Sequence, residues 1–210
     1  MNIAASAPNH HADYPGFAGP LGYLAGLSMT FGRAGDAELA ERLTNTQPGD
    51  RVVDVGCGPG TAVRHAARRG ATVTGVDPAP VMLRLARRLT RRRDRITLCQ
   101  GTAEALPLPD DSATVLWSIA TVHHWSDLHR ALDEIGRVLD ADGRFVAIER
   151  RSRPGATGHA SHGWTDAQTE AFAELCRTAG FDEVRVERHT HGRRTVVAVI
   201  AHNPRRSPSD

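Results

Sequence analysis

The sequence predicts a single α/β domain built on a seven-stranded mixed sheet with helices on both faces. Three observations support this prediction. Strand patterns alternate with helical patterns of about 10 to 15 residues between residues 51 and 149, which implies right-handed crossovers and a parallel sheet. Three alternating glycines follow the first strand pattern, as a tight strand-to-helix turn requires. The last two strand patterns are joined by a short turn, so they must pair antiparallel.

Each element has a local signal. Asp36 caps the first helix, which ends before the turn at 47–50, and Pro80 is suited to the first turn of a later helix. Thr165 and Gln168 form a capping-box pattern that begins the last helix. The expected helices begin at 36, cover 61–69, 80–93 and 126–139, and run from 165 to 180. The expected strands are 51–55, 71–76, 95–99, 113–120, 144–149, 183–189 and 194–202, with a turn at 142–143.

The domain prediction therefore has three parts. Residues 1–35 form an N-terminal arm without helical or strand periodicity, residues 36–202 form the α/β domain, and residues 203–210 form a polar tail. No internal repeat is found. The edge strands of such a sheet are compatible with a homodimer but do not require one.

Composition excludes several classes of protein. The chain has 210 residues, of which 40% are hydrophobic and 24% charged, with a formal net charge of +2; these values disfavour fibrous, disordered and membrane-spanning chains. Cys57, Cys99 and Cys176 show no paired spacing, so we expect a reducing compartment and neither disulfides nor zinc. No secretory signal or bilayer-length apolar stretch is found. These observations predict a cytoplasmic location.

The strongest motif is the glycine turn at 52–60, VVDVGCGPG. Gly56, Gly58 and Gly60 allow a ligand to approach the main chain and leave N–H groups available at the start of the next helix. Asp77 ends the second strand, where a carboxylate can accept hydrogen bonds from both ribose hydroxyls. Together these residues predict a nucleoside site.

A nicotinamide dinucleotide is the main competing ligand for this site. Its fingerprint requires G-x-G-x-x-G or A, whereas this chain has Thr61 at the last position and an additional Gly60. Asp54 lies two residues before the first glycine, where a carboxylate suits an ammonium group better than a pyrophosphate. The sequence thus favours a different nucleoside cofactor.

Five segments together resemble the successive signatures of class I S-adenosylmethionine-dependent methyltransferases. They are residues 54–60, 75–77, 101–107, 123–127 and 137–143. The resemblance covers about residues 36–202 and is closest to the small-molecule group typified by ubiquinone and menaquinone biosynthesis enzymes. It implies a Rossmann-like methyltransferase fold, S-adenosyl-L-methionine as cofactor, and methyl transfer to an oxygen or carbon of a small molecule.

The resemblance also implies roles for individual residues. Asp54, Gly56, Gly58 and Gly60 would hold the methionine end of the cofactor, Asp77 the ribose, and Met82, Thr102, Ala103 and Glu104 would flank the adenine. Family members usually carry Asp at the position of Thr102. Because a hydroxyl is a weaker acceptor than a carboxylate for the adenine amino group, we expect looser cofactor binding.

The acceptor side of the site is predicted from His123 and His124, which follow the fourth strand. A hydroxyl acceptor needs a base, and an imidazole is suited to that role; the alternative is that these histidines only shape the pocket. Trp125 is a candidate pocket wall. The resemblance also implies an N-terminal lid over the site, because members of this family often have one. The aromatic residues of the arm are suited to form such a lid. They are Tyr14, Phe17, Tyr23 and Phe31.

Two further features of the sequence bear on partners and metals. His159 and His162 lie in the loop after the fifth strand, but without a carboxylate cluster they do not predict a metal site. Arginines concentrate between residues 84 and 95 on one helical face, which raises RNA as an alternative substrate. Residues 118–121, SIAT, lack the Asn/Asp-Pro-Pro-aromatic motif of similar nucleic-acid enzymes. We therefore expect a small-molecule substrate and no nucleic-acid partner, with a non-catalytic cofactor-binding protein as the other alternative.

Overall fold

A computed structural model describes residues 7–12, 34–90, 95–191 and 194–204. Its strands are β1 (Arg51–Val55), β2 (Thr72–Asp77), β3 (Ile96–Gln100), β4 (Ala113–Ile119), β5 (Leu139–Arg150), β6 (Asp182–His191) and β7 (Arg194–His202). Its α-helices are α2 (Ala34–Leu43), α3 (Thr61–Arg68), α4 (Pro80–Leu89), α5 (Leu128–Val138) and α6 (Asp166–Thr178). Two short 3₁₀ helices, η2 (Val122–His124) and η3 (Gly158–Ser161), follow β4 and β5.

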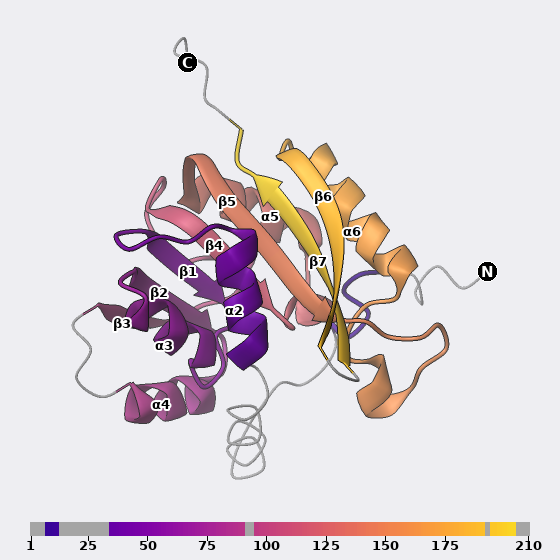
Figure 1. Cartoon of the computed structure of the whole chain (residues 1–210), viewed down its shortest axis with the longest axis horizontal. Helices are drawn as coiled ribbons and strands as arrows, with labels where there is room; N and C mark the ends of the chain where they lie inside the picture. Colours follow the sequence, from indigo (N-terminus) through magenta and orange to yellow (C-terminus); the bar gives the residue numbers. More distant parts are fainter. Residues whose placement is uncertain (1–6, 13–33, 91–94, 192–193, 205–210) are drawn as a thin grey trace.

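The strands form one seven-stranded sheet in the order β3-β2-β1-β4-β5-β7-β6 (Figure 1). Strands β1 to β5 are parallel to their neighbours in this group, whereas β7 lies antiparallel between β5 and β6. The predicted α/β fold with an antiparallel C-terminal hairpin is therefore confirmed. The strand order reverses between β1 and β4, and ligands of such sheets bind outside the carboxyl ends of the strands at this switch point.

Helices cover both faces of the sheet, and each face has its own hydrophobic core. On one face Leu39 of α2, Val63 of α3 and Leu83 of α4 pack against β1, β2 and β4. On the other face Leu132 of α5 and Phe172 of α6 pack against the opposite side of the same strands. Figure 1 shows α2 in front of the central strands and α5 behind them. This three-layer packing fixes the carboxyl ends of the strands relative to one another.

Several helix boundaries differ from the prediction. Helix α2 begins at Ala34 instead of 36, so Asp36, expected as its cap, lies within its first turn. Helix α4 ends at Leu89 instead of 93, with Thr90 as its cap, and residues 91–94 lie outside the described part of the chain. Helix α5 begins at Leu128 instead of 126 because the Asp127 carboxylate accepts a hydrogen bond from the Arg130 N–H at 3.1 Å. A side-chain cap of this kind determines where the helical backbone begins.

Strand β5 begins five residues earlier than predicted. Leu139, expected at the end of a helix, pairs with Ala113 of β4, and the pairing shifts register between Ala113 and Val115. Asp142, expected in a turn, has a φ of 62° inside the strand. The turn signal at 142–143 therefore corresponds to an irregularity within a long strand, a position where Asp tolerates the left-handed conformation.

The N-terminal end of α6 is held by the predicted capping box. The Thr165 hydroxyl accepts from the Gln168 N–H at 3.3 Å, and the Thr165 N–H donates to the Gln168 amide oxygen at 2.9 Å. We expect Thr165→Ala to lower the free energy of unfolding by about 1 kcal/mol, because the cap is lost. Chemical denaturation measures this loss. The control is Thr178→Ala at the other end of α6, where the exposed hydroxyl only donates to the Glu174 carbonyl one turn earlier; an equal effect of the two variants would contradict the account.

Residues 7–12 of the predicted arm lie against the carboxyl end of the sheet. The Trp164 indole N–H donates to the Pro8 carbonyl at 2.8 Å, and the His11 N–H donates to the His123 carbonyl at 2.9 Å. Asn9 donates to the Trp125 carbonyl at 3.0 Å. This part of the arm is thus ordered against the strand ends. The four aromatic residues proposed for a lid fall within 13–33, outside the described residues.

Within the described residues, no helix has the length and apolar character needed to cross a membrane.

Candidate active site

The ends of β1 and β4 meet at the switch point of the sheet. Gly56 follows β1 with a φ of 75°, and a Cβ at this position would overlap the side chain of Thr121, which follows β4. The Thr121 hydroxyl donates to the Val55 carbonyl at 3.1 Å. The close approach and the positive φ both require glycine at position 56. The predicted glycine turn is therefore built into the junction of the two central strands.

Asp77 organises the glycine turn from the end of β2. Its two carboxylate oxygens accept hydrogen bonds from the Gly58 N–H and the Ala79 N–H, each at 2.8 Å. Burial raises the pKa of Asp77, and these two N–H donors oppose the increase. Each carboxylate oxygen has a second lone pair. Asp77 can therefore hold the turn and still accept hydrogen bonds from a ligand hydroxyl.

The remaining predicted cofactor residues lie around this turn. Asp54 is buried near the end of β1, between Gly75 of β2 and Trp117 of β4. Gly60, with a φ of 76°, is the residue before α3. Met82 is buried on α4, Thr102 is exposed after β3, and Ala103 is buried beside it. Their contacts with a cofactor remain predictions.

Glu104 directs its carboxylate toward the start of α5. It accepts from the Ser126 N–H at 2.7 Å and the Ser126 hydroxyl at 2.9 Å. Although burial raises the pKa of Glu104, hydrogen bonds from its own backbone, from Ser126 and from Thr102 bring the pKa below its usual value. The side chain thus connects the segment after β3 to the segment that carries His123 and His124.

His123 forms a buried pair with Glu149, which lies near the end of β5. The His123 Nδ1 lies 2.9 Å from both carboxylate oxygens of Glu149, and the two side chains are 3% and 0% exposed. The His123 N–H also lies 3.4 Å from the same carboxylate. A carboxylate accepts only from a protonated nitrogen, so in the neutral ring Nδ1 carries the proton and Nε2 carries the lone pair. The pair therefore fixes both the tautomer and the orientation of the ring.

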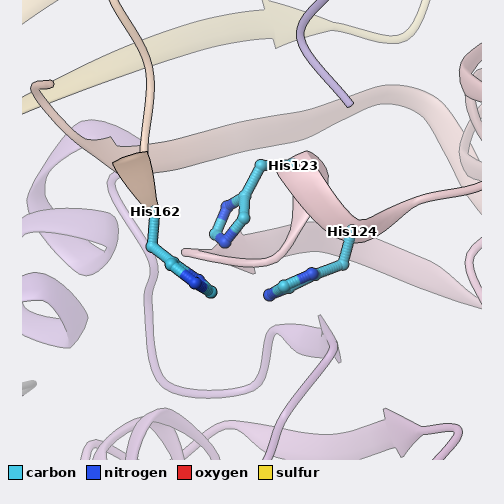
Figure 2. Close-up of side chains that lie close together, drawn as sticks. All are labelled: His123, His124 and His162. Atoms are coloured by element: carbon cyan, nitrogen blue, oxygen red, sulfur yellow. The ribbon is translucent and has the colours of Figure 1, made fainter. Parts of the chain in front are cut away.

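His124 and His162 join His123 to form what we call the histidine cluster. One ligand nitrogen of each ring lies within 4.8 Å of the other two, and Figure 2 shows the three rings converging on a common space. The ring centroids of His123 and His124 are 4.1 Å apart. Burial, followed by the proximity of His123, lowers the pKa of His124 to about 4. The His124 imidazole is therefore neutral near neutral pH.

Two histidines of the N-terminal arm lie against the histidine cluster. The His11 ring stacks on His162 with centroids 4.5 Å apart and an angle of 19° between the planes. The His10 Nε2 lies 2.9 Å from the Ser161 carbonyl, and its Nδ1 lies 3.1 Å from the Gln168 amide nitrogen. Both nitrogens of His10 are thus engaged in structural hydrogen bonds, and the arm covers one side of the cluster.

The loop after β5 holds His162 through main-chain contacts. The Trp164 N–H donates to the Arg150 carbonyl at 2.8 Å, and the Ser152 N–H donates to the Trp164 carbonyl at 2.7 Å. Gly163 has a φ of 138°, and a Cβ there would overlap the Arg150 carbonyl. This loop therefore requires glycine next to His162, and its backbone is fixed against the end of the sheet.

Arg151, which follows β5, is paired with a carboxylate of α6. Arg151 forms a bidentate pair with Asp166 at 2.6 and 2.8 Å, and Arg188 contacts the same carboxylate at 2.9 Å. The pairing with Arg151 lowers the pKa of Asp166 to about 2. The guanidinium of Arg151 thus joins the loop to α6 and has a structural role.

Sequence reasoning missed four residues of this site. Glu149 was treated only as the end of a strand, although its position on β5 beside β4 places it next to the residues that follow β4. His10 and His11 were assigned to a loose arm, although paired histidines are also present at 123–124. His162 was assigned no role because no carboxylate cluster accompanies it, and its histidine partners come from another strand end, a proximity that is not encoded in local spacing.

Comparison with known proteins shows to which protein family the chain belongs. Residues 53–147 match the family model described as a methyltransferase domain. This match, together with the methyltransferases to which the chain is similar, shows that the chain belongs to the S-adenosylmethionine-dependent methyltransferases. S-adenosylmethionine is accordingly the cofactor of its family.

Two curated methyltransferases are similar to this chain in sequence. The chain is 31% identical over 189 residues to the 27-O-demethylrifamycin SV methyltransferase of Amycolatopsis mediterranei, covering 82% of this chain and 66% of that protein. It is 36% identical over 108 residues to the demethylmenaquinone methyltransferase of Tropheryma whipplei, covering 51% of this chain and 45% of that protein. The chain thus spans about half the length of several curated relatives that it matches.

A solved structure supports the fold independently. A SAM-dependent methyltransferase from Aquifex aeolicus superposes with a TM-score of 0.72, covering 86% of this chain and 97% of that chain at 17% identity. At this identity the similarity concerns the fold.

Proposed function

We propose that this protein transfers a methyl group from S-adenosyl-L-methionine to an oxygen or carbon atom of a small molecule. The observation that carries the proposal is the contact of the glycine turn with Thr121. This contact places the glycine turn next to the segment that carries His123 and His124. Donor and acceptor would therefore meet at the switch point between β1 and β4, where the fold binds its ligands.

On the donor side, the chain positions an already activated methyl group. The sulfonium of the cofactor makes its methyl group electrophilic, so the protein has mainly to align the two reactants and exclude water. Asp54 and the glycine turn would hold the methionine part of the cofactor, and Asp77 would hold the ribose. Met82 and the residues Thr102, Ala103 and Glu104 would flank the adenine.

On the acceptor side, His123 would receive the proton that a hydroxyl acceptor loses. Glu149 holds Nδ1–H at 2.9 Å, so the Nε2 lone pair is the basic site. A base oriented by a buried carboxylate is the arrangement used by hydrolytic triads. A carbon nucleophile has the same need, since a proton must leave its carbon. His124, kept neutral by its burial, would line the same space without adding charge.

The N-terminal arm would complete the site. Within residues 7–12, the Asn9 side chain and the His11 N–H already contact the carbonyls of Trp125 and His123. We propose that residues 1–35 act as the lid of the 36–202 domain and that residues 203–210 form a polar tail. We also propose a cytoplasmic location, because three cysteines without a disulfide are typical of a protein in a reducing compartment.

A transfer assay tests the proposal against its alternatives. The protein is incubated with methyl-labelled S-adenosylmethionine and either a panel of phenols, hydroxylated polyketides and quinols or total RNA. We expect label in the small-molecule fraction and none in RNA. Label only in RNA would establish the RNA methyltransferase alternative. Cofactor binding without transfer to any member of a broad panel would favour the non-catalytic alternative.

A further inference from the structure

We propose that His123, His124 and His162 bind one divalent transition-metal ion of the zinc class at the acceptor side of the site. The three residues come from two separate segments, η2 after β4 and the loop after β5, and their rings converge on one space (Figure 2). Three histidines with one position left for water or substrate are a known ligand set of catalytic zinc.

The spacing of the three nitrogens is close to that of a bound state. Each pair lies within 4.8 Å, whereas a tetrahedral ion with Zn–N bonds near 2.0 to 2.1 Å separates its ligand nitrogens by about 3.3 Å. The adjustment required is therefore up to about 1.5 Å for a pair. His123 is fixed by Glu149, but His162 lies on a half-buried loop, where a change of side-chain rotamer can supply most of this movement.

The surroundings of His123 match those of a metal-ligating histidine. Such a histidine usually donates its second ring N–H to a carboxylate, which fixes the tautomer and makes the other nitrogen a better ligand. Glu149 does this for His123 at 2.9 Å from within the core. The His124 Nδ1 lies 3.4 Å from the His11 carbonyl, a contact that likewise assigns the proton to Nδ1 and the lone pair to Nε2.

The chemistry of the ligands selects the kind of ion. Neutral imidazoles suit zinc, iron, cobalt, nickel and copper, whereas magnesium and calcium prefer carboxylate and carbonyl oxygens. No carboxylate is among the grouped ligand atoms of the described residues, since Glu149 faces the opposite nitrogen of His123. We therefore infer a zinc-class ion and not magnesium.

The inference rests on the proposed function only for the role of the ion. An acceptor hydroxyl that occupies the open position would bind through its oxygen, and its O–H proton would pass to solvent because the ion lowers the pKa of the bound group. The oxygen lone pair then forms the new bond to the methyl carbon while the sulfonium carbon–sulfur bond breaks, without any change of oxidation state. In the metal-loaded protein the ion would thus replace His123 as the means of activation.

Cobalt binding tests the site directly. The full chain, with any purification tag removed and its metals stripped by chelation, is titrated with Co²⁺ while its visible absorption is followed. We expect one ion per chain, a dissociation constant below about 10 µM, and displacement of Co²⁺ by Zn²⁺. His162→Ala is expected to weaken binding at least about 100-fold, and Glu149→Gln about 10- to 100-fold.

His202→Ala is the matched control. His202 pairs with Arg144 and Asp182 at the opposite end of the sheet, so this variant is expected to bind Co²⁺ like the parent. Absence of stoichiometric binding, or equal binding by His162→Ala and the control, would overturn the inference. Should Glu149→Gln fail to fold, the His162→Ala comparison still decides. The thermal shift produced by S-adenosylmethionine in the metal-free protein tests the proposed function separately.

Discussion

His123→Ala is expected to reduce methyl transfer to a hydroxyl acceptor by about 10²- to 10⁴-fold, the contribution of a positioned base. The variant removes the imidazole that Glu149 orients at 2.9 Å, whether this ring acts as the base or as a metal ligand. Cofactor affinity should stay within a factor of about two, because the residues proposed to hold the cofactor lie at the ends of β1, β2 and β3 and in α4. Transfer rates and S-adenosylmethionine titrations of the same preparation measure the two quantities.

Two further variants serve as controls for His123→Ala, one for loss of folding and one for the orientation of the His123 ring. His202→Ala removes a histidine at the far end of the sheet and should leave the transfer rate unchanged. Glu149→Gln retains His123 but weakens its orienting partner, so its transfer rate should lie between those of the parent and His123→Ala. A transfer rate of the His123→Ala variant equal to that of the parent would show that this histidine only shapes the pocket.

Asp77→Ala is the second variant with a large expected effect. We expect the dissociation constant for S-adenosylmethionine to rise about 10- to 100-fold, which corresponds to roughly 1.5 to 3 kcal/mol for lost charge-assisted hydrogen bonds to the ribose. The same carboxylate also accepts the Gly58 and Ala79 N–H groups, so some loss of order in the glycine turn adds to the effect. Calorimetric titration measures the affinity.

Asp77→Asn separates the two contributions. The amide oxygen can still accept one of the two main-chain N–H groups, but it lacks the charge that strengthens the ribose contacts. Its loss of affinity should therefore be smaller than that of Asp77→Ala. Asp133→Ala, which removes an exposed carboxylate on α5, is the control for net charge. Unchanged affinity of Asp77→Ala would remove the ribose site from this position.

Local patterns predicted most of the fold because the elements carry strong signals of their own. Strand β1 matches its predicted bounds, since its apolar run is terminated by a turn that only glycine can adopt. Helix α6 begins where its capping box predicts. The early start of β5 was not predictable from the turn signal at 142–143, because its register depends on pairing with Ala113, a residue distant in the sequence.

The residues of the candidate site likewise include some that the sequence predicts and some that it does not. The glycine turn and Asp77 were predictable because a strand, a turn and a distal carboxylate lie at fixed spacings along the chain. The pairing of His123 with Glu149 and the approach of His162 were not, because they depend on the order of β4 and β5 in the sheet and on a loop held by contacts between Gly163 and Arg150. Side chains that converge from separate strand ends require the topology.

The most direct test of the central claim is a calorimetric titration of the protein with S-adenosylmethionine, S-adenosylhomocysteine and NAD in parallel. The account predicts one site per chain with micromolar affinity for the first two ligands and no binding of NAD, because Asp54 and Gly60 disfavour a pyrophosphate. Binding of NAD in preference to the two sulfur nucleosides would contradict it, as would a chain that binds none of the three.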